Sequence, residues 1–466
     1  MVFSNLFFLI CFLPIFLIFY HIAAVISGWN IGVENFVLVI FSLVFYMFGG
    51  ASGLCVLLVV SLIGWGSGWI IVINDEKKNA ARVCFIITVI LLVGVLAFFK
   101  YAGFFTNIVM PIGLSFYIFQ LISYVADVYT GKCELETNFR DFLLYTACFH
   151  HVLQGPIIRY GEVRDNIIDR RYSASTLAAG IYRFSLGLAK KVILADHAGD
   201  LANNLFPNTK DIASIPTLGI WLGSICFSLQ MYLDFSAYTD MAIGLGQMVG
   251  FKYPENFDYP YISKSVKEFW RRWHISLSFF FRDYVYIPLG GNRKGSVRKV
   301  FNLLVVWLLT GIWHGATLNF VIWGLYYFVF LVIENILAGK GKLPSFIQHI
   351  YVIFVFNLGW LIFRFDNIEN LKTAFLAFFG VTDNGFSTQT VSVAFQNNIF
   401  FFIVAVLACT PIFKKLMHAM EHRVKAKELP AGIIFGGKTV IAVAALILGI
   451  IIMAGSSYQP FLYNQF

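Results

Sequence analysis

A histidine lies near the middle of a long stretch without formal charge. Residues 301–333 contain no Asp, Glu, Lys or Arg, and His314 stands among them with Gly311 and Gly315 on either side. An ionisable side chain in such a stretch costs free energy and by default marks a functional site. A neutral imidazole can accept a proton at physiological pH, and the glycines would let a backbone or a slender ligand approach it. A buried histidine that only donates to a helix carbonyl is an equal alternative from position alone.

A second histidine, His274, lies in a segment rich in aromatic and basic residues. The residues directly before it are Trp270, Arg271, Arg272 and Trp273. The helical spacing of the tryptophans with Leu277, and the neighbouring cations, predict one amphipathic helix at the cytoplasmic membrane surface. An ordinary surface anchor with a snorkelling histidine is the alternative, and the segment taken alone favours it.

Two carboxylates occur in an otherwise apolar segment. Asp234 and Asp240 flank Tyr238, which is one helical turn after Asp234. A carboxylate in an apolar neighbourhood needs a partner. Arg271, Arg272 or a histidine oriented by one of the carboxylates could serve, and the spacing does not choose among them. A purely structural ion pair fits at least as well.

Several familiar catalytic motifs are missing from the sequence. It has no phosphate-binding glycine loop, no Gly-x-Ser-x-Gly elbow and no His-Glu-x-x-His pair, which argues against most familiar hydrolases and nucleotide-driven pumps. The adjacent His150 and His151 would point about 100° apart on a helix, and no further ligands have the spacing of a zinc site. We therefore expect no metal site and no bound cofactor.

The elements that position these residues must lie in a membrane. Of the 466 residues, 59% are apolar and 13% are charged, whereas a soluble chain has roughly 25% charged residues. A membrane helix needs about 20 apolar residues, and we count about eleven such stretches. They lie near 5–26, 33–50, 53–73, 83–99, 108–126, 176–195, 216–233, 300–336, 346–363, 397–413 and 433–454. The stretch 300–336 is long enough to be a broken or doubled element.

The basic residues orient these spans. The net charge of +9 comes from short loops between apolar stretches, so we expect orientation charge and membrane lipids as neighbours, not nucleic acid. The positive-inside rule places the loops 77–82, 159–171, 252–299 and 414–427 in the cytoplasm. This topology requires 141–158 and 234–250 to be re-entrant segments, which membranes tolerate only where the backbone is buried in protein or lines a wet cavity. The predicted fold is an all-α polytopic membrane protein, with one domain over residues 1–466.

Five segments together resemble the membrane-bound O-acyltransferase family. They are 111–117, 155–160, 234–244, 268–288 and 311–315, with the run Arg-Arg-Trp-His-Ile-Ser-Leu-Ser and the triplet Trp-His-Gly as the most specific parts. The resemblance covers roughly residues 111–327. Within the family the chain is most similar to the bacterial alginate O-acetylation branch, whose ending the residues 460–466 also resemble.

The resemblance implies a ring of membrane helices around a central tunnel, in a multi-pass protein of the bacterial inner membrane. The catalytic core would occupy 101–337, between N-terminal helices in 1–100 and C-terminal helices in 338–466. His314 matches the catalytic histidine of the family and His274 its second functional histidine. We predict that further residues bind substrate or support the site, namely Trp270, Arg271, Arg272, Trp273, Trp313, Asp234, Tyr238, Asp240 and Arg159.

The expected reaction is acyl transfer from a cytoplasmic thioester, such as acetyl-CoA, to a hydroxyl. This chemistry needs a base for the hydroxyl proton and a donor for the tetrahedral oxyanion. We expect His314 to be the base, since desolvation favours its neutral form. His274 would line the donor path with Trp270 and Trp273. Three nearby cations could attract the phosphates of coenzyme A, or could equally anchor lipids. These cations are Lys267, Arg271 and Arg272.

The acceptor is expected to lie outside the cell membrane. A chain without a large external domain is poorly suited to grip a long polymer, so we expect an extracytoplasmic acetyltransferase partner protein. By the resemblance, the acetyl group would pass through this partner to hydroxyls of an alginate-like exopolysaccharide or of peptidoglycan. One alternative is a D-alanyl transferase for teichoic acids from the same family. Another is a transporter or flippase, although the chain shows no matching halves of the kind that many transporters have.

Overall fold

The protein is helical throughout the part that the computed structural model describes, which is residues 1–102, 108–338, 343–426, 430–455 and 461. No strand occurs within these ranges. In a bilayer, a helix satisfies each backbone N–H and C=O within its own segment, which explains why long apolar stretches take this form. Of the ending 460–466, Phe461 alone lies within the described ranges, and its side chain is buried. The all-α prediction is confirmed.

Eight helices among the described residues are long and apolar enough to cross a membrane. They are α1 with the preceding turn (Phe8–Ile26), Ala51–Ile73, Lys78–Tyr101, Thr217–Met248, Gly295–His314, Leu318–Leu337, Ser345–Arg364 and Gly432–Gly455. The pair Gln389–Asn397 and Ile399–Ala408, bent by 59°, would make up to nine. A multi-pass membrane protein is therefore confirmed, whereas the expected count of eleven is not. The expected spans 33–50 and 108–126 are the shorter apolar helices α2 (Ile31–Met47) and α5 (Leu114–Tyr129).

Two expectations about irregular elements meet different outcomes. The stretch 300–336 is indeed doubled, as helices α13 (Gly295–His314) and α14 (Leu318–Leu337). The re-entrant assignment of 234–250 is wrong, because α10 (Thr217–Met248) continues through it as one helix of 32 residues. Its carboxylates are held in ion pairs, so the helix does not have to break to satisfy them. The other segment, 141–158, holds the short helix α6 (Phe139–Ala147) followed by turns.

The described residues form two compact units. The first takes its residues from Met1–Leu188, Tyr238–Glu255 and Leu446–Tyr458, and the second from Ala189–Ala237, Asn256–Ala445 and Gln459–Phe466. The expected boundaries at residues 100 and 337 stay a prediction.

The first unit contains the helices up to α8. They are α1 (Leu13–Ile26), α2, α3 (Ala51–Ile73), α4 (Lys78–Ala102), α5, α6, α7 (Tyr160–Ile168) and α8 (Ala174–Ala189). A buried ion pair joins α2 to the segment after α7: Arg170 Nη2 lies 3.4 Å from Glu34 Oε2, and Tyr20 donates to the same carboxylate oxygen at 2.8 Å. These contacts satisfy charges that could not otherwise be buried.

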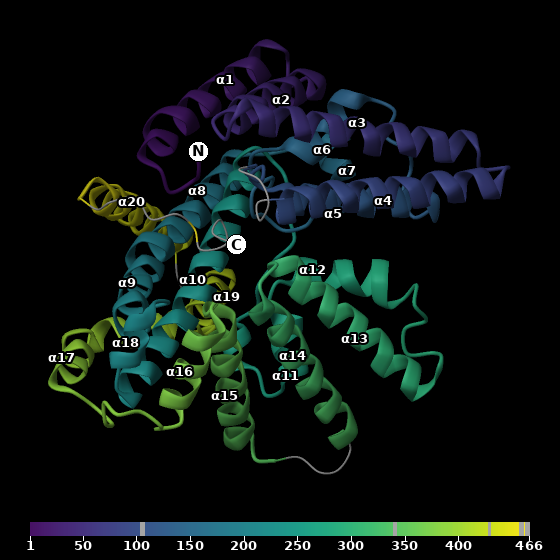
Figure 1. Ribbon diagram of the computed structural model, residues 1–466. Helices are drawn as coiled ribbons and strands as arrows, with labels where there is room; N and C mark the ends of the chain where they lie inside the picture. Colours follow the sequence, from purple (N-terminus) through teal and green to yellow (C-terminus); the bar gives the residue numbers. More distant parts are fainter. Residues whose placement is uncertain (103–107, 339–342, 427–429, 456–460, 462–466) are drawn as a thin grey trace. The chain divides into compact units, whose positions relative to one another are not determined.

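The second unit contains most of the remaining helices, and these carry both histidines of interest. Its helices include α9 (Asp196–Leu205), α11 (Val266–Arg272), α12 (Ile275–Phe281), α13, α14, α15 (Ser345–Arg364), α16 (Ile368–Phe378), α17 (Gln389–Asn397), α18 (Ile399–Ala408) and α19 (Ile412–Lys425), while α10 and α20 (Ala431–Gly455) contribute residues to both units. Figure 1 shows α12, α13 and α14 as neighbours in this unit. Large rings fill its core, among them Trp273, Trp323 and Trp360.

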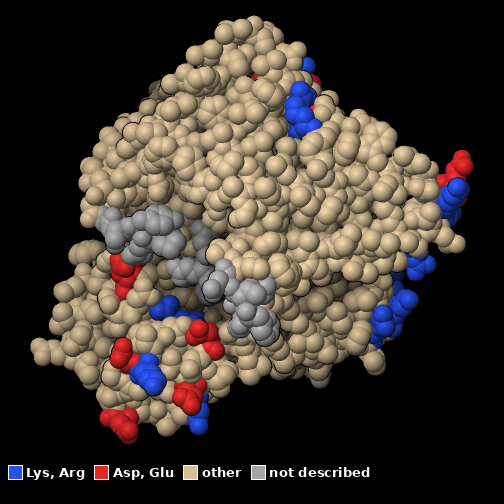
Figure 2. Space-filling view, turned by 45° about the horizontal axis from the view of Figure 1, so that its top comes forward, with Lys and Arg blue, Asp and Glu red and all other residues tan. Residues whose placement is uncertain are grey.

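Charged residues are sparse on the surface. On the face that Figure 2 shows, Lys, Arg, Asp and Glu form small groups around a broad area without charge. Large apolar side chains such as Ile26, Phe400 and Val440 are more than half exposed. Such a surface suits contact with lipid.

Candidate active site

The chain breaks its helix at His274. Helix α11 ends at Arg272 and α12 begins at Ile275, and His274 between them has φ +43°. This left-handed conformation is unusual for a residue other than glycine. The expected single amphipathic helix is therefore wrong, and neither short helix is among the candidate membrane spans.

Residues from an earlier loop stabilise this break. The Ser276 backbone N–H and side-chain hydroxyl donate to Asn256 Oδ1 at 3.1 and 3.0 Å, and the Ile275 N–H donates to the Asn256 carbonyl at 3.0 Å. On the other side of the break, the Asp258 N–H donates to the Arg272 carbonyl at 3.0 Å. Groups that a continuous helix would pair internally are thus satisfied by the 256–258 loop.

His314 is the last residue of α13, and aromatic rings surround it. Its side chain is buried, with the Trp323 ring 4.9 Å and the Phe363 ring 5.2 Å from it, both edge-on. Gly315 follows in an extended conformation and ends the helix. The imidazole is therefore held in a largely apolar wall at a helix terminus.

The glycines near His314 permit a close approach of helices. A Cβ on Gly311 would lie 2.4 Å from the Phe320 carbonyl oxygen, and one on Gly324 would lie 2.4 Å from the Trp307 carbonyl oxygen. Helices α13 and α14 therefore contact each other through their backbones at this crossing. The expectation that glycine allows a backbone to come close to His314 fits this contact.

Both histidines line one cavity of about 220 Å³ in the second unit. Other residues in its wall are Trp270, Trp273, Leu277, Ser278, Phe281, Arg282, Tyr286, Leu303, Val306, Trp307 and Thr310. His274 directly precedes α12 and His314 ends α13, while Arg282 and Tyr286 belong to the π-helical turn η5 (Arg282–Tyr286) that continues α12. The cavity thus combines two imidazoles, an apolar aromatic wall and one cation.

Tryptophans hold the wall of this cavity in place. The Trp270 ring is edge-on to Trp307 at 4.9 Å and to Tyr327 at 4.7 Å. Trp313 lies beside both histidines, with its ring 6.2 Å from the His274 ring and 4.7 Å from the His314 ring. Of the tryptophans expected at the site, Trp270 and Trp273 line the cavity and Trp313 contacts its histidines.

The expected cations Arg271 and Arg272 do not line the cavity. Arg272 is held by Asp258 at 3.1 Å and by Glu268 at 2.9 Å, and Arg271 is exposed and absent from the cavity wall. The cation that lines the cavity is Arg282, which is paired with the neighbouring Asp283 at 2.6 Å and whose side chain is 53% exposed. Sequence reasoning missed both Arg282 and Asn256. Arg282 lay inside the resembling segment 268–288, but no spacing marked it.

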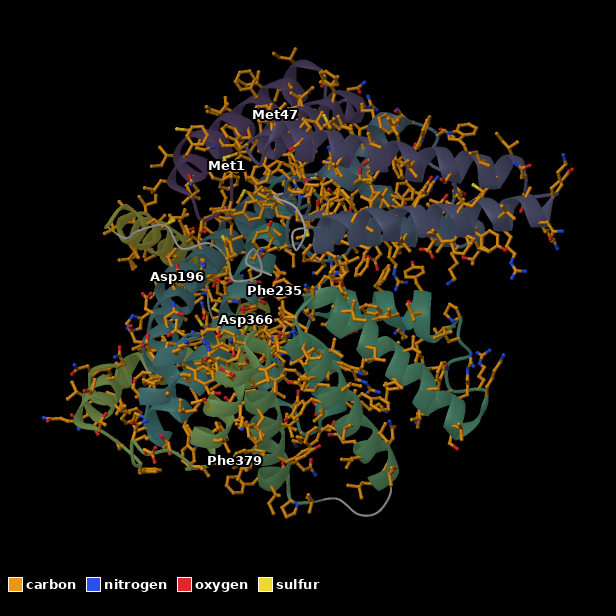
Figure 3. All side chains as sticks on the ribbon, viewed as in Figure 1. Met1, Met47, Asp196, Phe235, Asp366 and Phe379 are labelled. Carbon is orange, nitrogen blue, oxygen red and sulfur yellow. The ribbon has the colours of Figure 1, made fainter. Side chains whose placement is uncertain are left out.

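The carboxylates have partners that spacing could not select. Asp234 lies 2.7 Å from Lys191 Nζ, which also lies 2.7 Å from Asp196, a residue labelled in Figure 3. In the first unit, Arg183 pairs with Asp240 at 3.0 Å. These contacts are ion pairs of the structural kind that the sequence left open.

Two further candidates lie in the first unit. The Tyr238 ring stacks on Phe3 at 4.8 Å, and Arg159 is half-buried at the start of α7, where its backbone N–H donates to Glu162 at 3.1 Å. Among the described residues there is no group of three or more His, Cys, Asp or Glu side chains that could hold a metal ion.

Burial sets the protonation state of His274. Loss of solvent lowers the pKa of His274 to about 3, because an apolar surrounding disfavours the charged imidazolium. The ring is therefore neutral at physiological pH, and one of its nitrogens is an acceptor.

Comparison with known proteins identifies the family. The model of the membrane-bound O-acyltransferase family matches residues 136–365. A "Probable alginate O-acetylase" from Azotobacter vinelandii is 34% identical, and the match covers 100% of both chains. The chain belongs to the membrane-bound O-acyltransferase family. This acyltransferase is also 30% identical to a peptidoglycan O-acetyltransferase from Helicobacter pylori, over 100% of this chain and 98% of the relative.

A teichoic acid D-alanyltransferase from Bacillus subtilis is 31% identical to this chain, and the match covers 51% of this chain and 63% of the relative. The range that matches the family includes every residue that lines the cavity. The protein is thus a multi-pass membrane enzyme that transfers acyl groups to oxygen, as its sequence predicted.

Proposed function

We propose that this enzyme moves an acetyl group from a cytoplasmic thioester donor to an extracytoplasmic polysaccharide, with the chemistry in the cavity between His274 and His314. One observation carries the proposal: two buried histidines from separate helices line a single cavity of about 220 Å³. Most isolated buried histidines only complete a hydrogen-bond network. Two that share one apolar-walled space are suited to proton transfer.

His314 is the general base in this proposal. As a hydroxyl attacks the thioester carbonyl, its proton passes to His314, and the tetrahedral adduct then expels the thiolate, which takes up the proton. The rings of Trp323 and Phe363 pack edge-on against the imidazole and hold it in place for this proton transfer. A positioned base of this kind contributes roughly 10²–10⁴ in rate.

The donor is proposed to be acetyl-CoA or another acyl thioester with a phosphate group. Arg282 in the cavity wall supplies a positive charge where the donor would enter. The loop and helix start that follow are also basic, with Arg293, Lys294, Arg298 and Lys299. A cluster of this sign attracts a polyanionic donor from solution.

Acetyl rather than D-alanyl transfer is favoured by the extent of similarity. The relatives named as O-acetylase and peptidoglycan O-acetyltransferase match the whole of this chain, whereas the relative named as a teichoic acid D-alanyltransferase matches about half. The acceptor would then be an alginate-like exopolysaccharide or peptidoglycan. A partner protein outside the membrane would carry the acetyl group to the polymer, because the described residues contain only helices and short links.

Membrane vesicles with the cytoplasmic face outward test this proposal. We expect label from [¹⁴C]acetyl-CoA, or from an acetylated carrier thioester, to enter base-labile esters on polymer in the vesicle lumen when the wild-type enzyme is present. His314→Ala should remove the signal, and His349→Ala should keep it, because His349 lies on α15 and contacts the Ser263 carbonyl outside the cavity wall. Transfer of label from a D-alanyl carrier thioester, supplied in a parallel assay, and not from the acetyl donors would make the D-alanyl alternative correct.

A further inference from the structure

We propose that Asn256 fixes the tautomer of His274, so that His274 presents an unprotonated Nε2 to the cavity and serves there as a hydrogen-bond acceptor. In this view Asn256 is a positioning residue, and His274 orients an N–H or O–H group of the substrate beside His314. The inference rests on the proposed function, since it assigns a role within the same cavity.

The orientation of the Asn256 amide follows from a donor that cannot reverse its role. The Ser276 backbone N–H points at the Asn256 side chain, with the acceptor atom 3.1 Å away. A backbone N–H only donates, so the atom facing it must be the carbonyl oxygen and not the amide nitrogen. The Ser276 hydroxyl donates to the same oxygen at 3.0 Å. The Asn256 side chain is buried and does not contact solvent.

The tautomer of His274 follows from the identity of that oxygen. His274 Nδ1 lies 3.3 Å from Asn256 Oδ1. A carbonyl oxygen can only accept, so Nδ1 must carry the hydrogen in this bond. A neutral imidazole has one N–H, which leaves Nε2 with a lone pair.

The ring is also held in orientation by its neighbours. The Phe235 ring, on α10 and labelled in Figure 3, is edge-on to the His274 ring at 4.8 Å, and Trp313 lies on another side at 6.2 Å. The left-handed backbone at His274 turns the chain sharply between the two short helices. His274 lines the cavity and Asn256 does not, so the ring lies between Asn256 and the cavity, with Nδ1 on the side of Asn256.

This arrangement restricts the chemistry that His274 can perform. An Nε2 without hydrogen cannot donate to the oxyanion of a tetrahedral adduct, so that stabilisation must come from another group. It can accept a hydrogen bond from the attacking hydroxyl or from an amide N–H of the donor. His274 and His314 then have different tasks despite sharing one cavity.

Among the described residues of the cavity wall, the charged or titratable groups besides His274 are Arg282, Tyr286 and His314. Asp283, which follows Arg282, is paired with it at 2.6 Å. Asp258 in the capping loop is paired with Arg272, and Asp234 on α10 is paired with Lys191. A carboxylate introduced at position 256 would therefore be a strong new influence on the pKa of His274.

The test replaces Asn256 by Asp and by Leu in the full-length enzyme in membranes. Asn256→Asp keeps an acceptor for Ser276 and for Nδ1, but its negative charge raises the pKa of His274. We expect near wild-type kcat at about pH 8.5 and a loss of at least about tenfold at about pH 6, where the wild type stays active. Asn256→Leu should lose at least about tenfold in kcat at both pH values.

Two results would overturn the inference. One is an Asn256→Asp profile that matches the wild type while His274→Ala is inactive, which would leave the proposed function standing. The other is a ¹⁵N spectrum of histidine-labelled wild type, compared with His274→Ala, in which the hydrogen of His274 is on Nε2. This spectrum needs no Asn256 variant and so decides the matter even if Asn256→Leu does not fold. Full activity of His274→Ala would also overturn the inference, and it would leave the role of His314 as the base in the proposed function standing.

Discussion

His274 and His314 line the same cavity although they stand at the start of one helix and the end of another. The Trp313 ring lies between them in the packing, 6.2 Å from the His274 ring and 4.7 Å from the His314 ring. The relationship depends on two local features: the break before α12, which turns His274 inward, and the close crossing of α13 with α14, which fixes His314. Changes to either feature should therefore act on catalysis without touching a histidine.

Gly311→Ala should disturb the crossing of α13 and α14. The new Cβ would lie 2.4 Å from the Phe320 carbonyl oxygen, so the helices must separate, at a cost of roughly 1–3 kcal/mol. We expect lower thermal stability in detergent and a loss of acyl transfer of at least about tenfold. Gly94→Ala is the matched control, because nothing lies within 4 Å of its added Cβ. Equal behaviour of the two variants would contradict the close crossing.

Arg282→Glu should weaken the use of the donor. Arg282 lines the cavity, and reversing its charge would repel a phosphate-bearing thioester. We expect KM for the donor to rise at least about fivefold and the effect to shrink at high salt. Arg271→Glu makes the same change in charge at an exposed site outside the cavity wall. If Arg271→Glu raises KM as much as Arg282→Glu, the cavity does not receive the donor at Arg282.

Asp196 should make the stability of the protein depend on pH. Burial raises the pKa of Asp196 from 3.8 to about 6, so the folded protein holds this proton more tightly than the unfolded chain. The resulting stability is fully present below about pH 3.8, is lost as the pH rises through about 6, and amounts to at most roughly 3 kcal/mol. The unfolding temperature of the wild type and of Asp196→Asn, measured between about pH 3.8 and 6, tests this contribution. The unfolding temperature of the variant should depend less on pH than that of the wild type. An equal pH dependence of the two proteins would contradict the raised pKa of Asp196.

Breaking the buried ion pair of Arg170 and Glu34 should destabilise the first unit. Their side chains are 0% and 2% exposed, and removal of one partner from such a pair costs roughly 3–5 kcal/mol. Glu34→Ala and Arg170→Ala should each lower the unfolding temperature, and the double variant should lose less than the sum. Arg171→Ala, whose side chain is 88% exposed, should change little. Additive losses would show that the two side chains do not interact.

The sequence predicted the membrane fold because that feature is local, and it marked His314 as a candidate for the same reason, whereas His274 was singled out only by the resemblance to the family. Long apolar stretches and an ionisable residue within one of them can be read directly from the chain, as for His314. The break at His274 could not be read in this way. It depends on hydrogen bonds from Asn256, and helical periodicity contains no information about a loop that folds back from elsewhere in the chain.

Partners of buried charges were the other feature that the sequence left undecided. Asp234 needed a cation, and Arg271 and Arg272 were candidates by proximity in the site. The structure places Lys191 there instead, on the π-helical turn η2 (Lys190–Ala195). Tertiary packing chooses among several chemically equivalent cations, and one sequence alone gives no means of ranking them.

The most direct measurement is the amount of acetate released by mild base from the surface polymers of cells that lack the native gene and carry one variant each. Wild type, His314→Ala and His349→Ala are compared at equal membrane levels of folded enzyme. We predict ester-linked acetate with wild type and His349→Ala, and at least about a hundredfold less with His314→Ala. This factor is the lower end of the rate acceleration that a positioned base supplies. Wild-type levels of acetate with His314→Ala would contradict acyl transfer through this cavity.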